Sequence, residues 1–217
     1  MTFLVSEQKD LITRIRRALD PVPAGHSETP PPGDKVRGDH DLNPETAPDR
    51  SKGFTPAAVL VPIVMREGGM SVILTRRATH LSRHAGQISF PGGRADPEDR
   101  DAVATALRES EEEISLDPAR VEVIGGLTQY ITVTRYCVTP VVGLVRPPFD
   151  LRAEEGEVSE IFEVPLEFLL DAANRKKHSG FHNGVERFWY AIPFRDYYIW
   201  GATAGMIKDL SERVCAK

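Results

Sequence analysis

The chain has 217 residues, of which 41% are hydrophobic, so it is long and apolar enough for one ordinary domain with a buried core. Its formal net charge of -5 argues against a general nucleic-acid binder, because such binding depends on Lys and Arg that neutralise phosphates. The two cysteines form neither a CxxC motif nor a Cys/His pattern, so neither a disulfide framework nor a zinc site is expected. No apolar run reaches the about 20 residues of a membrane-spanning helix, and no signal-peptide core is present, so the sequence predicts a cytoplasmic protein.

Residues 1–54 are predicted to form an N-terminal helix and a linker. Apolar residues recur at helical spacing between Leu11 and Leu19, and Ser6 is a suitable N-cap for this helix. Residues 20–53 are rich in Pro, Gly, Asp and Ser and have almost no apolar periodicity, which is typical of a linker or a long surface loop. The folded domain is therefore placed at residues 55–217.

The domain is predicted to mix hairpins with isolated helices. Strands are expected at residues 57–66, 70–77, 86–90, 121–127, 138–145, 158–164 and 186–192. Residues 67–69, Glu-Gly-Gly, separate the first two strands and predict a hairpin with a short turn. Helical periodicity begins near Asp101, a short helix is expected after Pro165, and a final one at residues 202–214. Because a regular βαβα alternation is absent from this pattern, the predicted fold class is α+β with a mixed sheet.

Four glutamates lie within five residues of the stretch LRESEEEI, residues 107–114. On a helix, Glu109, Glu112 and Glu113 occupy positions i, i+3 and i+4 and share one face beside the apolar stripe, whereas Glu111 points elsewhere. Like charges at this spacing destabilise a helix by roughly a few tenths of a kcal/mol, so something should compensate them. A bound cation is one explanation and a well-solvated surface helix is the other.

The sequence FPGG, residues 90–93, begins at the end of the predicted strand 86–90. It lies about 16 residues before Glu109. Its glycines permit positive φ and close approach of the backbone to a ligand. Mg²⁺ prefers oxygen ligands and is often bound between one or two carboxylates and the phosphates of a substrate. Backbone carbonyls and carboxylates brought together in this way predict a divalent cation site and a diphosphate substrate.

Residues 92–116, GGRADPEDRDAVATALRESEEEISL, resemble the Nudix box, written G, five residues, E, seven residues, then REUxEExGU with U aliphatic. The match is strong at Arg108, Glu109, Glu112, Glu113 and Leu116. One additional residue lies before Arg108, and Asp99 or Glu98 takes the first acidic position. Ser115 stands at the glycine of the box, and Ser110 replaces its first aliphatic residue.

Residues 73–93, ILTRRATHLSRHAGQISFPGG, are similar to LLTxRSxxxRxxxGxVxFPGG, a motif that accompanies the box in coenzyme A-type Nudix hydrolases. Ser82 stands where the motif has its second arginine, and Arg83 follows it. The additional residue in the box is also a feature of that subfamily. The resemblance covers roughly residues 55–215 and implies an α/β/α sandwich with a mixed β-sheet and a loop–helix–loop catalytic motif.

The resemblance implies hydrolysis of a nucleoside diphosphate linked to another group, with Mg²⁺ or Mn²⁺ as the cofactor. It assigns the metal to Glu109, Glu112 and Glu113, with a carbonyl from Gly92 or Gly93. Arg108 braces the loop through an acid, for which Asp99 is the first choice. The catalytic base is Glu109 or an acid in residues 154–160, of which Glu157 is the first choice. A solvated acidic turn without a catalytic role is an equally good interpretation of residues 154–160.

The leading substrate hypothesis is coenzyme A or acyl-CoA, cleaved to 3′,5′-ADP and 4′-phosphopantetheine or its acyl form. Arg77 and Arg83, in a basic segment, are candidate ligands of its phosphates because Arg makes bidentate phosphate contacts. The alternatives are ADP-ribose, NADH or a dinucleoside polyphosphate as substrate, and a nucleotide-binding module without turnover. The expected partner is this small nucleotide, with neither nucleic acid nor membrane, and a homodimer is expected by family analogy alone.

Overall fold

The computed structural model describes residues 2–26, 36–81, 84–182 and 184–216. The main sheet contains β1 (Arg37–Gly38), β2 (Thr55–Arg66), β3 (Gly69–Arg77), β4 (Ile88–Ser89), β5 (Gly92–Arg94), β6 (Val121–Gly126), β7 (Tyr130–Ile131), β8 (Tyr136–Val145) and β9 (Val158–Pro165). A small antiparallel sheet contains β10 (Lys176–His182), β11 (Val185–Phe194) and β12 (Tyr197–Trp200). The helices are α1 (Thr2–Ala18), α2 (Ala102–Ile114), α3 (Leu166–Leu170) and α4 (Gly201–Cys215), with short 3-10 turns η1 (Asp39–Asp41), η2 (Pro44–Thr46), η3 (Pro118–Arg120) and η4 (Ala172–Asn174).

The main sheet is mixed, which confirms the predicted α+β class. Its central strand β2 runs parallel to β8 along one edge, and antiparallel to β3 and then β5 along the other. The predicted hairpin is present, because Arg66 at the end of β2 pairs with Gly69 at the start of β3. β5 therefore continues in line with β3, and this brings the FPGG loop beside the middle of the sheet.

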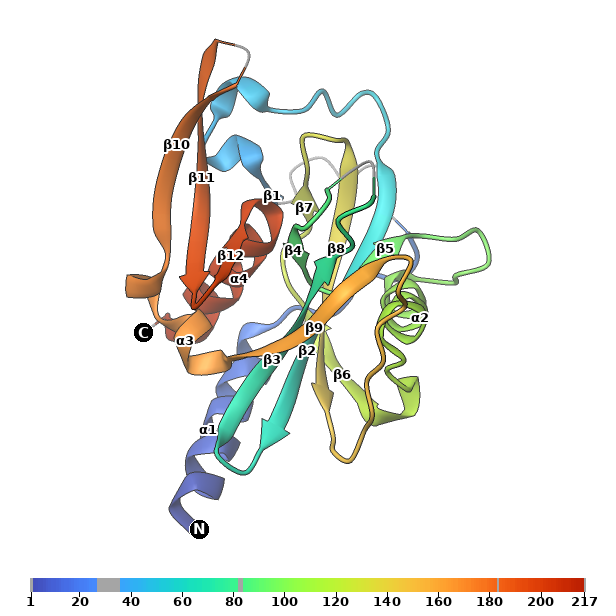
Figure 1. Cartoon of the computed structure of the whole chain (residues 1–217), viewed down its shortest axis with the longest axis vertical. Coiled ribbons are helices and arrows are strands. Elements are labelled where there is room, and N and C mark those ends of the chain that lie inside the picture. Colours follow the sequence, from blue (N-terminus) through green and yellow to red (C-terminus); the bar gives the residue numbers. More distant parts are fainter. Residues whose placement is uncertain (1, 27–35, 82–83, 183, 217) are drawn as a thin grey trace.

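Helices cover both faces of the main sheet, with α2 on one side and α1, α3 and α4 on the other (Figure 1). Because side chains alternate along a strand, β2 supplies both layers. Val61 and Ile63 pack in the cluster that contains residues of α1, α3 and α4. Leu60 and Val64 pack in the cluster that contains residues of α2. The predicted α/β/α sandwich is thus present, and α2 lies directly on the central strand.

The N-terminal segment differs in part from its prediction. α1 begins at Thr2, so Ser6 lies inside the helix and is not its N-cap. Ile15 is fully buried in the core beside residues of α4, because α1 docks on the domain. The segment expected to be a linker contains β1, η1 and η2, while its residues 27–35 lie outside the described part of the chain. No helix in the described ranges is both long and apolar enough to cross a membrane.

Candidate active site

The helix α2 presents the glutamates, and both of its ends are fixed locally. Asp101 is its N-cap and accepts a hydrogen bond from the backbone N–H of Ala104 at 2.9 Å. The helix ends at Ser115, which has φ 56 and so takes the left-handed conformation that a C-terminal glycine usually adopts. Ala106 and Ile114 are fully buried against the sheet. This packing sets the rotation of the helix, and with it the direction of each glutamate.

The three glutamates expected to share one face are not equally placed. The side chain of Glu113 is 5% exposed and that of Glu109 is 16% exposed, whereas that of Glu112 is 59% exposed. Glu112 accepts a hydrogen bond from Arg108 at 2.9 Å at the surface. Glu111 is exposed, in agreement with its prediction as a solvated residue. Two carboxylates are therefore enclosed at the site, and the third stands at its rim.

The glycines of the FPGG loop allow the close contact between this loop, β2 and α2. Gly92 has φ 148, and a Cβ at this position would lie 2.4 Å from the carbonyl oxygen of Ala58 on β2. A Cβ at Gly93 would lie 2.5 Å from the carboxylate of Glu109. The N–H of Gly92 donates to Glu113 at 3.1 Å. The loop thus forms a cradle for the two enclosed carboxylates, which only glycine permits.

Arg108 lies against Asp99, the partner that the sequence favours. Its Nε and Nη2 donate to the two oxygens of Asp99 at 3.1 and 2.9 Å, and Nη2 also donates to the carbonyl of Arg94 at 3.2 Å. These charge-assisted bonds hold the pKa of Asp99 at about 2 and raise the pKa of Arg108. Thr105 and the backbone N–H of Asp96 also donate to Asp99, at 2.8 and 2.9 Å. The carboxylate of Asp99 is therefore saturated with donors.

Burial and mutual repulsion act on the two enclosed glutamates. Burial raises the pKa of Glu113 to about 7, repulsion from Glu109 and Glu157 adds to this, and the N–H of Gly92 and the charge of Arg77 oppose it. The pKa of Glu109 is also raised, mainly by burial. Arg77 lies near Glu113, with 3.6 Å between Nη1 and Oε1. The site thus concentrates negative charge that the neighbouring arginines compensate only in part.

The loop between β8 and β9 brings Glu157 to this cluster. The backbone N–H of Glu154 donates to the carbonyl of Glu113 at 2.9 Å, which satisfies one of the free carbonyls at the end of α2. The carbonyl of Glu157 accepts from Ala78, just after β3, at 2.8 Å. Glu157 is exposed, and its charge raises the pKa values of both Glu109 and Glu113. Glu160 is instead bound by Arg76 and Tyr197.

The structure describes only part of the predicted basic segment. Arg77 is at the site, whereas Arg83 and the motif departure Ser82 lie outside the described residues. His84 is exposed and lies 2.8 Å from Gln87, between Nδ1 and Oε1. Thr105 is a residue that the sequence interpretation did not single out. Its position three residues before Arg108 is the pattern that could have indicated a shared partner.

A divalent cation fits the donors present, although they are not assembled as a closed cage. In the described part of the chain, no three His, Cys, Asp or Glu side chains are grouped closely enough to hold a metal ion. Glu109 and Glu113 both carry raised pKa values, which a cation would lower, and Gly93 keeps space beside Glu109. Two carboxylates completed by substrate phosphates are a common Mg²⁺ environment. Glu112 is hydrogen-bonded to Arg108, and it would have to leave Arg108 to bind the same cation.

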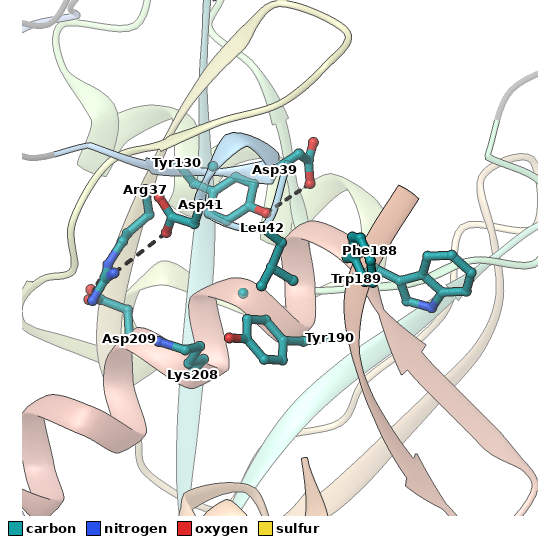
Figure 2. Close-up of a pocket in the computed structure, with 13 residues that line it drawn as sticks. Arg37, Asp39, Asp41, Leu42, Tyr130, Phe188, Trp189, Tyr190, Lys208 and Asp209 are labelled. Atoms are coloured by element: carbon teal, nitrogen blue, oxygen red, sulfur yellow. Dashed lines mark hydrogen bonds and ion pairs between the residues drawn. The ribbon is translucent and has the colours of Figure 1, made fainter. Parts of the chain in front are cut away.

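A separate hollow lies between α4, β11 and residues 37–42 (Figure 2). Its cavity volume is about 20 Å³, which is room for roughly one water molecule and not for a nucleotide. Its polar groups are already paired, since Tyr130 donates to Asp39 at 2.9 Å and Arg37 contacts Asp41 (Figure 2). None of the residues of the glutamate cluster lines it. It is not a candidate for the catalytic site.

The family model of the NUDIX domain matches residues 54–183, which include β2 to β9, α2 and the glutamate cluster. The chain belongs to the Nudix family. A relative from Escherichia coli K12, named Uncharacterized Nudix hydrolase NudL, is 44% identical over 162 residues, which are 74% of this chain and 83% of the relative. The chain is therefore a Nudix hydrolase that acts on nucleoside diphosphate compounds, and enzymes of this family generally use divalent ions such as Mg²⁺.

Two solved structures show weaker similarity. The binary complex of Caenorhabditis elegans Ap4A hydrolase is 20% identical, with a TM-score of 0.45 over 51% of this chain and 80% of that one. The NUDIX domain of Shewanella oneidensis NrtR, complexed with ADP ribose, is 20% identical, with a TM-score of 0.43 over 59% of this chain and 84% of that one. Similarity at this level assigns no substrate.

Proposed function

We propose that this Nudix hydrolase cleaves the diphosphate of coenzyme A or acyl-CoA to 3′,5′-ADP and 4′-phosphopantetheine or its acyl form. The supporting observation is that residues of the coenzyme A-type motif contact the carboxylate of Glu113, which belongs to the Nudix box. Gly92 donates to Glu113 at 3.1 Å, and Arg77 lies 3.6 Å from the same side chain. The proposed role of Arg77 is to bind the reacting diphosphate, because a planar guanidinium suits bidentate phosphate contact. Arg83 is proposed as a second phosphate ligand from the motif alone.

The proposed metal ligands are Glu109, Glu112, Glu113 and a carbonyl of Gly92 or Gly93. Mg²⁺ or Mn²⁺ bound there would neutralise the diphosphate and lower the pKa of the attacking water. Arg108 holds Glu109 through a contact of 3.0 Å and is itself fixed by Asp99. Its proposed role is to keep Glu109 in one orientation, because misplacement of a catalytic group by about 1 Å can cost on the order of 10²-fold in rate.

Hydrolysis breaks one P–O bond of the diphosphate, and the water oxygen remains on one phosphorus while its proton passes to a base. Glu109 and Glu157 are the two candidates for this base. Glu109 is already engaged by Arg108 at 3.0 Å, whereas Glu157 is exposed and sits close enough to influence both glutamates. We therefore assign the proton to Glu157. Glu157→Gln should lower kcat with little change in metal affinity, whereas Glu109→Gln should weaken both.

The proposal is tested by product analysis on a panel of substrates. Purified protein is incubated with coenzyme A, acetyl-CoA, ADP-ribose, NADH and diadenosine polyphosphates, with Mg²⁺, Mn²⁺ or a chelator, and the products are identified by mass. We expect 3′,5′-ADP from coenzyme A, and no product with the chelator. In ¹⁸O-labelled water, the mass of each product shows which phosphorus is attacked.

Two variants of α2 serve as test and control for the substrate panel. Glu113→Gln should abolish turnover, while Glu111→Gln, on the same helix but exposed, should retain it. ADP-ribose or a dinucleotide cleaved far faster than coenzyme A would overturn the substrate assignment and favour the second hypothesis. Cleavage of no compound, with nucleotide binding retained, would favour the nucleotide-binding module. A homodimer and a cytoplasmic location stay predictions.

A further inference from the structure

Residues 20–26 follow α1 and lead to residues 95–100, the loop before α2. We call residues 20–26 the strap and residues 95–100 the catalytic loop. Asp20 and Gly126 exchange two backbone hydrogen bonds, at 3.1 and 2.8 Å, so the strap joins the end of β6. Val22 packs against the hydrophobic cluster that contains Ala102 and Ala106 of α2. Two independent contacts therefore fix its course.

His26, at the end of the strap, binds the loop that leads into α2. Its Nε2 lies 3.0 Å from the backbone carbonyl of Asp99. A carbonyl oxygen only accepts hydrogen bonds, so the ring nitrogen carries the proton and donates it. Both the neutral Nε2–H tautomer and the imidazolium have this proton, so the bond does not depend on the charge of the ring.

The catalytic loop, residues 95–100, has few external backbone bonds. In the described ranges, Ala95 donates to the carbonyl of Pro56 at 3.0 Å at the start of the loop, and His26 binds Asp99 near its end. The other backbone bonds of the loop are internal, such as that from Asp99 to Asp96 at 3.0 Å. Without His26, the end of the loop that carries Asp99 would be held from outside only through side chains.

We propose that His26 is a positioning residue of the hydrolytic site. It fixes the backbone of Asp99, whose carboxylate holds Arg108, and Arg108 in turn contacts Glu109 at 3.0 Å. The inference rests on the proposed role of Glu109 in catalysis. His26 lies outside the matched domain, residues 54–183, so the N-terminal segment contributes a contact that the family model does not contain.

The test compares variants at His26 that keep or remove the donor. His26→Leu removes it at similar bulk, and His26→Gln retains an N–H at a similar distance from the backbone. Ala24→Ser changes an exposed residue of the same strap and is the matched control. For each, kcat and KM are measured on the diphosphate that the wild type cleaves fastest, and hydrogen–deuterium exchange is followed in residues 94–100.

We expect His26→Leu to lower kcat about three- to tenfold, the range for loss of one hydrogen bond, with KM changed less than about twofold. Exchange in residues 94–100 should accelerate in the same variant. His26→Gln and Ala24→Ser should behave as the wild type in both measurements. Should His26→Leu fail to fold, His26→Asn, whose amide is too short for this contact, replaces it.

Two results would overturn the assignment. One is wild-type kcat and wild-type exchange in the donor-free variant. The other is a His26→Gln variant as impaired as His26→Leu, which would show that the hydrogen bond is not the cause. If the wild type cleaves no diphosphate, the proposed function fails, and the exchange measurement still decides whether His26 holds the loop.

Discussion

Asp99→Asn removes the negative charge that fixes Arg108 and should destabilise the protein measurably. The carboxylate of Asp99 is 7% exposed and accepts hydrogen bonds from Arg108, Thr105 and the N–H of Asp96. Its pKa falls from 3.8 to about 2, chiefly through Arg108, and this difference corresponds to about 2.4 kcal/mol of folding free energy. Because Arg108 is 31% exposed and its charge is screened, we expect about 2 kcal/mol.

The pH dependence gives a second, independent prediction for Asp99. The pKa is lower in the folded state than in the unfolded state, so its contribution is fully present above pH 3.8 and is lost as the pH falls toward 2. The difference in unfolding free energy between wild type and Asp99→Asn should therefore be constant near neutral pH. At pH 3 it should shrink to about half of its value at pH 7.

Urea unfolding of both proteins at several pH values measures this difference. Asp150→Asn is the control, because Asp150 is 79% exposed in a surface ion pair with Arg152 and should change the unfolding free energy by less than about 1 kcal/mol. A difference below about 0.5 kcal/mol at pH 7, or one that does not shrink toward pH 3, would refute the reasoning that Arg108 stabilises the ionised carboxylate.

Three other substitutions have expected outcomes. Glu113→Gln should make the metal-free protein more stable at pH 8 by on the order of 1–3 kcal/mol in urea unfolding, because it removes a buried, repelled carboxylate, while turnover is lost. Gly93→Ala should reduce kcat at least about tenfold, because its Cβ would meet Glu109, whereas Gly68→Ala, with nothing within 4 Å, should not. Ser115→Gly should raise the unfolding free energy by about 0.5–1 kcal/mol, since Ser115 has φ 56, and an unchanged value would contradict this.

The sequence was sufficient for α2 and its surroundings because local patterns determine them. Helical periodicity, a capping Asp101 and two adjoining glycines each limit the backbone to few conformations. Angular spacing predicted that Glu111 points into solvent, and Glu111 is exposed. It did not predict that the side chain of Glu112 would be 59% exposed and bound to Arg108. That contact depends on tertiary structure, because the loop before α2 holds the guanidinium of Arg108.

Elements without a local pattern were not predicted. β10 has the sequence KKHSGFH, which lacks alternating apolar residues, and it is a strand because β11 pairs with it along its length. The contact between His26 and Asp99 spans 73 residues and arises in a segment that composition marks as a linker. The prediction at Ser6 was wrong for a different reason: the residue type suits an N-cap, but α1 already begins at Thr2.

The charge balance of the site explains why the cation and the substrate should bind together. Among the described residues, its carboxylates are Asp99, Glu109, Glu112, Glu113 and Glu157, and its guanidinium groups are Arg77 and Arg108. Fully ionised, these groups would hold three negative charges more than positive ones. Burial is the main cause of the raised pKa of Glu113, and repulsion from Glu109 and Glu157 adds to it. A diphosphate brings further negative charge, so it is repelled until a divalent cation is present. Arg77 offsets this repulsion only in part, because its charge already faces Glu113. We therefore expect a divalent cation to promote substrate binding as well as the chemical step.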